Sequence, residues 1–288
     1  MKRPGVALLL AFAAPIAAAA DARWYTQIDN DVAFGTDRWY SSGVRIARVD
    51  ERIEWGLVHE VYTPEAKHWQ PGTIDRAPVG RLLASAALHD RGPGYFQTLE
   101  LDAGVRGPAA LGRQLTEAIH RLIPGPHVDW SRQLENRLDV DLAAVRSQSL
   151  GTDHVKVHAG AVLGRDVTFA HAGAELRFGV DPAASSQLLR YAATPPWSDG
   201  APAAGFGGLG VMVGASARAV LRNALLERNY DPFGPPLSRR RTVRRLVGGI
   251  HWTQPWGALS FEMAQDSREF DAQRAPHKFG SLSIHVAF

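Results

Sequence analysis

Cysteine is absent from this chain of 288 residues. In an exported protein, that absence excludes a framework of disulfide bonds, so packing and hydrogen bonding must stabilise the fold. The G-x-S-x-G nucleophile elbow of serine hydrolases and the H-E-x-x-H motif of zinc proteases are missing as well. The sequence therefore offers no motif that supports either of these two hydrolase classes.

Net charge is also small, at +3 for the whole chain. The first residues, MKRPGVALLLAFAAPIAAAADA, combine Lys2 and Arg3 with an apolar run and a stretch of alanines. This is the pattern of a secretory signal peptide cleaved near Ala20, whereas a membrane anchor would need about 20 strongly apolar residues. Removal of residues 1–20 leaves a net charge of 3 − 2 = +1. A mature protein so close to neutrality has no electrostatic basis for binding nucleic acid.

Long apolar runs are missing from the rest of the chain, so no transmembrane helix is expected there. What is present is alternation with a period of two. In the closing SLSIHVAF, Leu282, Ile284 and Phe288 fall on one face and polar or small residues on the other, and residues 154–164 and 257–265 repeat the pattern. A soluble periplasmic β-protein also alternates, but many such segments in an exported chain that ends in phenylalanine favour an outer-membrane barrel.

We predict one all-β domain over residues 21–288, a transmembrane antiparallel β-barrel of about twelve strands. The expected strands are residues 24–33, 38–48, 53–62, 80–89, 95–105, 135–148, 153–163, 167–179, 208–221, 241–252, 256–267 and 278–288. Aromatic residues near the strand ends are expected at the membrane interfaces. They are Trp24, Trp39, Trp55, Tyr62, Tyr95, Trp252 and Trp256.

The longest outer loops are expected at residues 64–79, 106–134 and 222–240. Residues 181–206, rich in proline, alanine and serine, would be an unusually long periplasmic turn, which we interpret as an insert.

One segment departs from the β pattern. Residues 108–123 carry leucine and isoleucine at helical spacing, with a proline near the start, and predict a short helix in an extracellular loop. This helix carries His120 beside its apolar stripe. Taken alone, His120 is either a catalytic group or a packed, hydrogen-bonded histidine.

The stretch DNDVAFGTDRWYSSG, residues 29–43, is rich in oxygen donors. If Trp24 and Ile28 face lipid, then Asp29 and Asp31 face the lumen, and on the next strand Ser41 does the same. Carboxylates and a hydroxyl would then converge at the outer end of the first hairpin, as oxygen ligands do around Ca²⁺. The alternative is an ordinary polar lining of the lumen.

Several blocks in register resemble the LpxR family of outer-membrane lipid A 3′-O-deacylases. They are NDVAFGTDRWYSSG at residues 30–43, YTP at 62–64, DRAPVGR at 75–81, GPAALGRQLTEAIH at 107–120 and DWSRQLEN at 129–136. The resemblance implies a twelve-stranded barrel that uses Ca²⁺ to remove the 3′-linked acyloxyacyl chain of lipid A.

Residue by residue, the resemblance implies four catalytic positions. Asn30 and Asp31 match the family's Asn-Asp pair, Ser41 matches the hydroxyl residue that follows the tyrosine, and His120 matches the catalytic histidine. Asp31 and Ser41 would also be ligands of Ca²⁺. A glutamate found beyond the histidine in some members has no counterpart, and Asp129 is the candidate substitute for it.

Basic residues are the expected contacts to the phosphates of the substrate. The resemblance places Lys67 and His68 in this role. Two interpretations fit the arginines at the outer start of the tenth expected strand: phosphate contacts, or a charge cluster in the lumen or at the barrel rim. They are Arg239, Arg240 and Arg241, with Arg244 and Arg245.

The expected function is therefore Ca²⁺-dependent ester hydrolysis on lipid A, by a monomer in the bacterial outer membrane. Histidine side chains titrate near neutral pH, so His120 can take a proton from the attacking water, while Ca²⁺ stabilises the oxyanion. The alternatives are an outer-membrane phospholipase that acts on glycerophospholipid esters, and a non-enzymatic structural or porin-like barrel.

Overall fold

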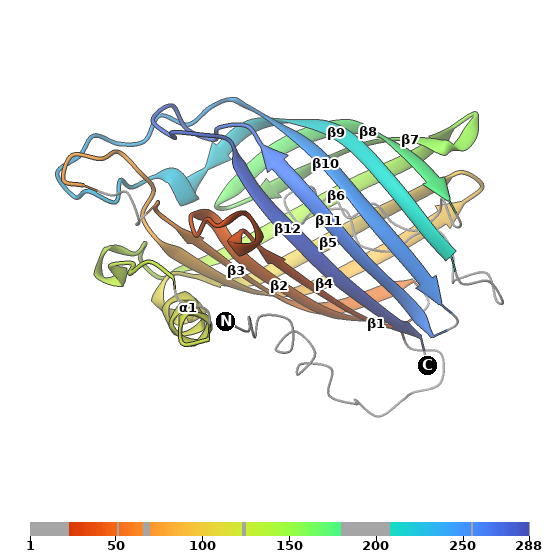
Figure 1. Cartoon of the computed structure of the whole chain (residues 1–288), viewed down its shortest axis with the longest axis horizontal. Helices are drawn as coiled ribbons and strands as arrows, with labels where there is room; N and C mark the ends of the chain where they lie inside the picture. The colour runs from red at the N-terminus through yellow and green to blue at the C-terminus, as the bar shows by residue number, and fades with distance from the viewer. Residues whose placement is uncertain are drawn as a thin grey trace, which may run out of the picture.

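The computed structural model describes residues 23–50, 52–65, 70–122, 125–179, 208–254 and 256–287. Twelve antiparallel strands form a closed barrel, in which each strand pairs with its neighbours in the chain and β12 pairs with β1 (Figure 1). This confirms the predicted fold class. The expected signal peptide and the insert at 181–206 lie outside the described residues.

The strands of the barrel run close to their predicted positions. They are β1 (Arg23–Asn30), β2 (Trp39–Asp50), β3 (Ile53–Thr63), β4 (Val79–Gly92), β5 (Tyr95–Arg106), β6 (Arg137–Leu150), β7 (Thr152–Gly164), β8 (Val167–Gly179), β9 (Gly208–Asn223), β10 (Thr242–Gln254), β11 (Gly257–Asp266) and β12 (His277–Ala287). We call the end that carries the loops after β1, β3, β5 and β9 the outer end, and the opposite end the periplasmic end.

Side chains alternate between the two faces of the barrel wall. Along β1, Tyr25, Gln27 and Asp29 are buried on the lumen side. Large apolar side chains are exposed on the other face of strands β3 to β11, among them Leu57, Leu99, Leu142, Leu163, Leu246, Ile250 and Met263. The outer wall is therefore apolar, as in barrels whose strands cross a membrane.

Aromatic residues follow the predicted interfacial pattern only at the periplasmic end. There Trp55, Trp252 and Trp256 are exposed. The interfacial position predicted for Trp39 and Tyr62 is wrong, since both are buried at the outer end. They belong to the packing that closes the mouth of the barrel.

Ion pairs fill the lumen. Arg81, almost fully buried, lies 2.7 Å from a carboxylate oxygen of Glu60, 2.7 Å from Asp139 and 2.6 Å from Asp141. Arg45 bridges Glu54 and Glu100 in the same way. An unpaired buried charge is strongly destabilising, so these ion pairs hold the lumen side chains in place. The paired side chains fill part of the lumen that an open channel would need.

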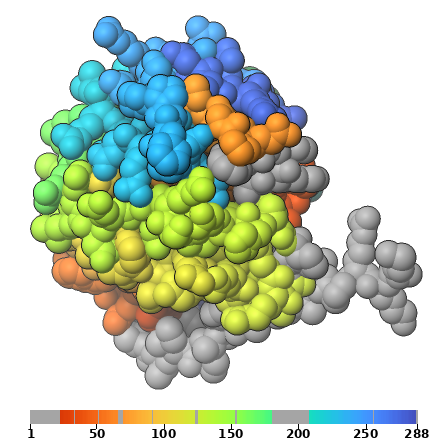
Figure 2. All heavy atoms as spheres, turned by 90° about the vertical axis from the view of Figure 1, so that its left-hand side faces the viewer, coloured from red at the N-terminus to blue at the C-terminus, as the bar shows by residue number. Residues whose placement is uncertain are grey.

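Loops cross the outer mouth and hydrogen-bond to one another. The segment after β9 donates from the backbone N–H of Tyr230 to the carbonyl of Asp75, and accepts at the carbonyl of Arg228 from the N–H of Ala77. Figure 2 views this end, where residues 70–78, 107–122, 125–136 and 224–241 cover the barrel.

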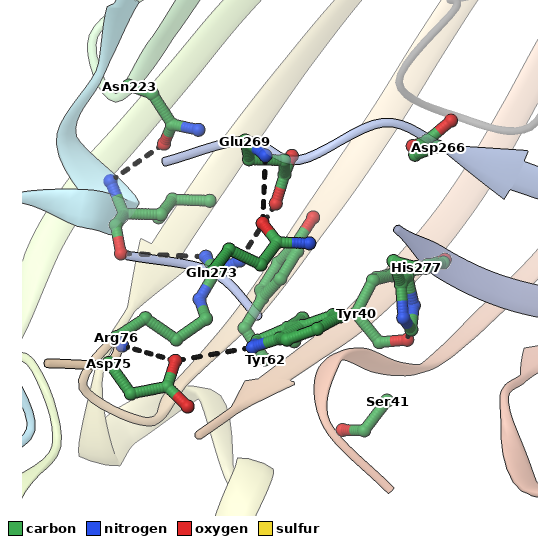
Figure 3. Close-up of polar contacts among 12 residues, drawn as sticks. Tyr40, Ser41, Tyr62, Asp75, Arg76, Asn223, Asp266, Glu269, Gln273 and His277 are labelled. Carbon is green, nitrogen blue, oxygen red and sulfur yellow. Dashed lines mark hydrogen bonds and ion pairs between the residues drawn. The ribbon is translucent and has the colours of Figure 1, made fainter. Parts of the chain in front are cut away.

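Side chains complete the closure beneath these loops. The guanidinium of Arg76 lies 4.4 Å from the ring centroid of Tyr62 and 3.3 Å from a carboxylate oxygen of Glu269. Asp75 accepts a hydrogen bond from the indole N–H of Trp39 at 3.2 Å. In Figure 3 this chain of contacts runs from Asp75 through Arg76 to Glu269, and Ser41 lies outside it.

The loop after β5 folds back over the outside of the barrel. It contains a 3₁₀ turn (Pro108–Ala110) and the helix α1 (Gly112–His120), which is shorter than the predicted 108–123 because Leu111, at φ 60°, interrupts it. Val61 points outward from β3, yet it is fully buried against Leu115, Val128 and Trp130 of this loop. Among the described residues, no helix is long and apolar enough to cross a membrane.

A close backbone approach anchors α1 to the wall. A Cβ added at Gly80 of β4 would lie 2.9 Å from the Cα of Gly112, so only glycine fits at this contact. His59 Nε2 also lies 2.7 Å from the carbonyl oxygen of Ala110. The sequence of the loop therefore fixes α1 on the outer wall of β3 and β4, at the left of Figure 1, and sets the position of its last residue, His120.

Candidate active site

Asp31 organises the loop between β1 and β2. Its carboxylate accepts hydrogen bonds from the hydroxyl of Thr36 at 2.7 Å and from the backbone N–H of Arg38 at 3.0 Å. Burial raises the pKa of Asp31 to about 7, and these two donors oppose that shift. No cationic side chain is among the groups that shift this pKa most. A cation placed beside Asp31 would therefore favour its ionised form.

Ser41 lies at the same end of the first hairpin as Asp31. The register pairs Asn30 with Ser42, so Asp31 and Ser41 each come one residue beyond the last paired position. The pairing of β2 with β3 shifts at this point, which makes Ser41 the extra residue of a β-bulge. Its hydroxyl donates to the carbonyl of Val61 at 3.3 Å. Ser41 is buried at the outer end of the hairpin, the end at which the sequence analysis expected its hydroxyl.

His120 reaches the same hairpin from α1. Its Nε2 lies 2.7 Å from Oδ2 of Asp37, and the two side chains are 23% and 18% exposed. Burial raises the pKa of Asp37, and the neighbouring His120 opposes that rise. The charge of Asp37 also contributes to the raised pKa of Asp31. The imidazole and the acidic hairpin loop are therefore parts of one electrostatic site.

Gly125 packs directly over this pair. A Cβ at residue 125 would lie 2.4 Å from Nε2 of His120 and 2.8 Å from Oδ2 of Asp37. The returning chain can approach the pair so closely only because it has no side chain there. Asp37 and Gly125 are thus two positioning residues that we did not predict as site residues.

The oxygen donors around Asp31 fit the Ca²⁺ that the sequence leads us to expect. Its carboxylate and the hydroxyl of Ser41 are hard ligands, suited to Ca²⁺ rather than to a soft transition metal. Within the described residues, no group of three or more histidine, aspartate and glutamate side chains is arranged as a metal site. A cation here would therefore also need backbone carbonyls and water, both of which are common Ca²⁺ ligands.

The structure gathers some of the predicted residues and separates others. Asp31 and Ser41 lie at the outer end of the first hairpin, and His120 contacts Asp37 of its loop. Asn30 shapes the turn by accepting a hydrogen bond from the N–H of Val32 at 2.7 Å. Lys67 and His68 lie outside the described residues.

The structure does not bring Arg239 and Arg240 to His120. Arg239 donates to the carbonyl of Val220, and Arg240 lies 3.2 Å from a carboxylate oxygen of Asp271. Both residues belong to the β9–β10 side of the mouth, whereas α1 lies on β3 and β4, six strands away in a ring of twelve.

Asp129 does not substitute for the missing glutamate. Its carboxylate accepts from the hydroxyl of Ser131 at 2.6 Å and pairs with Arg132 at 3.0 Å, so it begins a 3₁₀ turn instead of contacting His120. Asp37, and not Asp129, is the acidic residue that contacts His120. The acidic composition of residues 29–43 was a signal for such a partner, but nothing in the sequence indicated which of its acids would face the helix.

Comparison with protein families decides where this chain belongs. The model of the family described as outer membrane protein LpxR matches residues 46–288. The chain belongs to the LpxR family. The match includes His120, whereas Asp31, Asp37 and Ser41 precede its first residue. Membership of LpxR makes this an outer-membrane protein, in agreement with the apolar outer wall of the barrel.

Among solved structures, LpxR from Salmonella typhimurium has the same fold. LpxR from Salmonella typhimurium aligns with a TM-score of 0.75 at 20% identity, covering 92% of this chain and 100% of that one. The translocator domain of the autotransporter NalP from Neisseria meningitidis aligns with a TM-score of 0.45 at 11% identity, covering 94% of this chain and 90% of that one. A comparison with curated proteins found no match. The similarity to the Salmonella structure supports the twelve-stranded LpxR barrel for this chain.

Proposed function

We propose that this LpxR-family protein is an ester hydrolase of the outer membrane that removes the 3′-linked acyloxyacyl chain of lipid A. One observation carries the proposal: His120 and Asp37 form a 2.7 Å pair between α1 and the acidic hairpin loop. A histidine oriented by a carboxylate is the arrangement that general-base catalysis needs.

His120 would act as the base. Its Nε2 faces Asp37, which leaves Nδ1 to accept a proton from the water that attacks the ester carbonyl. Asp37 would hold the ring in this orientation and stabilise the imidazolium that forms. Water would be the nucleophile, in agreement with a sequence that has no serine elbow.

Ca²⁺ held by Asp31, with the Ser41 hydroxyl beside it, would supply positive charge where the oxyanion develops. The raised pKa of Asp31 supports this assignment, because a buried acid with no cationic neighbour among its main influences is a group that a bound cation would ionise. Asn30 would contribute by fixing the turn that presents Asp31.

The position of the site suits a lipid substrate. The loop that carries His120 packs on the outward face of β3 and β4, so the base lies on the lipid side of the wall. An ester in the outer leaflet could reach His120 without entering the lumen. The ion pairs of Arg81 and Arg45 in that lumen count against the porin alternative.

Mass spectrometry of lipid A from cells that express the protein tests the proposal. The wild type with Ca²⁺ should release the 3′-linked chain, and His120→Gln should not. The matched control is His127→Gln, an exposed histidine of the same loop, which should retain activity. An unchanged acylation pattern with the folded wild type and Ca²⁺ present would overturn the proposal.

Two further measurements test the role of Ca²⁺ and the choice of substrate. Asp31→Asn should abolish both activity and its dependence on Ca²⁺, as judged by chelation and re-addition of the ion. Purified enzyme should hydrolyse lipid A and leave glycerophospholipid vesicles intact. Hydrolysis of the vesicles alone would support the phospholipase alternative.

A further inference from the structure

Three cations are exposed at the outer end of the barrel, on strands β9, β10 and β12. They are Arg222 on β9, Arg244 on β10 and Lys278 on β12, and we call them the outer-wall cations. Arg244 is exposed between the buried Val243 and Arg245, so its side chain faces away from the lumen. Lys278 is exposed in the same way between the buried His277 and Phe279.

These cations lie where the apolar wall ends. Leu221, beside Arg222, is 69% exposed, and Leu246, the next outward residue below Arg244, is 59% exposed. On β11, between β10 and β12, Met263 is exposed below the level of Gln265, which pairs with Lys278. A lipid with its chains on this apolar surface would have its headgroup beside the three charges.

Among the residues that the structure describes, the outer-wall cations have no carboxylate partner. Within the part of the chain that the structure describes, no aspartate or glutamate lies at ion-pair distance from any of the three. By contrast, Arg218 and Arg245, inward on the same strands, both pair with Asp266. The inward arginines are thus neutralised by the protein itself, and the outward ones leave positive charge for a ligand.

Most of the location is separate from the candidate active site. α1 and His120 pack on β3 and β4, whereas Arg222 and Arg244 stand on β9 and β10, six strands away in the closed ring, and Lys278 stands on β12, which pairs with β1 (Figure 1). A lipid held along β9 to β12 would have its acyl chains on a different part of the wall from α1.

We propose that the outer-wall cations form a second lipid site, which binds the phosphate groups of a lipid A molecule of the outer leaflet whose acyl chains lie along the apolar wall of β9 to β12. Arginine and lysine beside an apolar surface complement an anionic headgroup with acyl chains. The site would hold a lipid without hydrolysing it. The inference rests on the outer-membrane location and not on the proposed deacylase activity.

Native mass spectrometry of the detergent-purified protein provides the test. Bisphosphorylated lipid A is titrated into delipidated His120→Gln with a chelator present, so that no substrate is consumed. The triple variant Arg222→Gln, Arg244→Gln and Lys278→Gln, made in the same background, should bind one lipid fewer. Each removed charge should weaken binding about fivefold, and all three on the order of a hundredfold. The control carries Arg48→Gln and Arg146→Gln, outward-facing arginines near the periplasmic end.

Several results would overturn the proposal. One is equal retention of lipid A by the triple variant and the control. Another is equally tight binding of dephosphorylated lipid A or of phosphatidylglycerol, because the site would then not recognise lipid A phosphates. The triple substitution in the wild-type background should leave lipid A hydrolysis unchanged; lost hydrolysis would place these residues in the active site. If the wild type hydrolyses nothing, the binding result stands and only the proposed function fails.

Discussion

Substitution of Gly125 by alanine should separate the His120–Asp37 pair without altering the chemistry of either group. The new Cβ would lie 2.4 Å from Nε2 of His120, whereas ordinary van der Waals contact begins at 3.4 Å. The ring or the chain must therefore move by about 1 Å, the difference of these distances. If the ring moves by this distance away from Asp37, the 2.7 Å contact lengthens to about 3.7 Å, beyond hydrogen-bond range.

Misplacement of a catalytic group by 1 Å costs roughly a hundredfold in rate. We therefore expect kcat on lipid A in detergent micelles to fall about a hundredfold in Gly125→Ala, with KM little changed because the substitution leaves the rest of the substrate surface intact. The assay is release of the acyl chain, followed by mass spectrometry. Heat-modifiable electrophoretic migration shows in parallel that the barrel is folded.

Gly248→Ala is the matched control. A Cβ there would come no closer than 3.8 Å to another atom, and Gly248 is not among the residues with positive φ. This variant should retain wild-type kcat. If Gly125→Ala is equally active while correctly folded, catalysis does not depend on the geometry of the pair, and the role we give Asp37 is wrong.

Three further predictions concern activity, pH dependence and stability. Asp37→Asn should lower kcat by 10²–10⁴-fold and change the pH–rate profile, whereas Asp129→Asn should do neither, as steady-state assays across pH can show. Burial raises the pKa of Asp75 to about 6, above the usual 3.8, so its stabilising contribution is full below about pH 4 and is lost as pH rises through 6. Relative to Asp75→Asn, the free energy of unfolding of the wild type should therefore fall by about 2 kcal/mol between pH 4 and 7 in urea titrations, and parallel curves would refute this. Arg81→Met should destabilise the barrel by about 3–5 kcal/mol in the same titrations, because it leaves buried carboxylates unpaired; a loss below about 1 kcal/mol would show that water or other cations already compensate them.

The strands were predictable because alternation is a local property. A residue that faces lipid must be apolar whatever the rest of the chain does, so each strand carries its own pattern. The inward orientation of Asp29 followed from the same rule, whereas the bulge at Ser41 interrupts the alternation of β2. The interfacial prediction failed for Trp39 and Tyr62, because the loops that bury them join the mouth from distant parts of the chain.

The contact between His120 and Asp37 was not predictable in this way. The two residues are 83 positions apart, and they meet only because the loop after β5 folds onto the outer wall. That folding depends on the glycine contact between Gly80 and Gly112, which leaves no periodic signal. The resemblance predicts His120 as the catalytic histidine, but it left open which group orients the ring.

The burial of Val61 beneath the loop that carries α1 has a consequence for kinetics. Since His120 stands on the membrane-facing side, the proposed enzyme should meet its substrate by lateral diffusion within the leaflet. Turnover should then follow the mole fraction of lipid A in the bilayer or micelle rather than its bulk concentration. Diluting the substrate with inert detergent should slow the reaction, even when the total amounts of enzyme and lipid A stay constant.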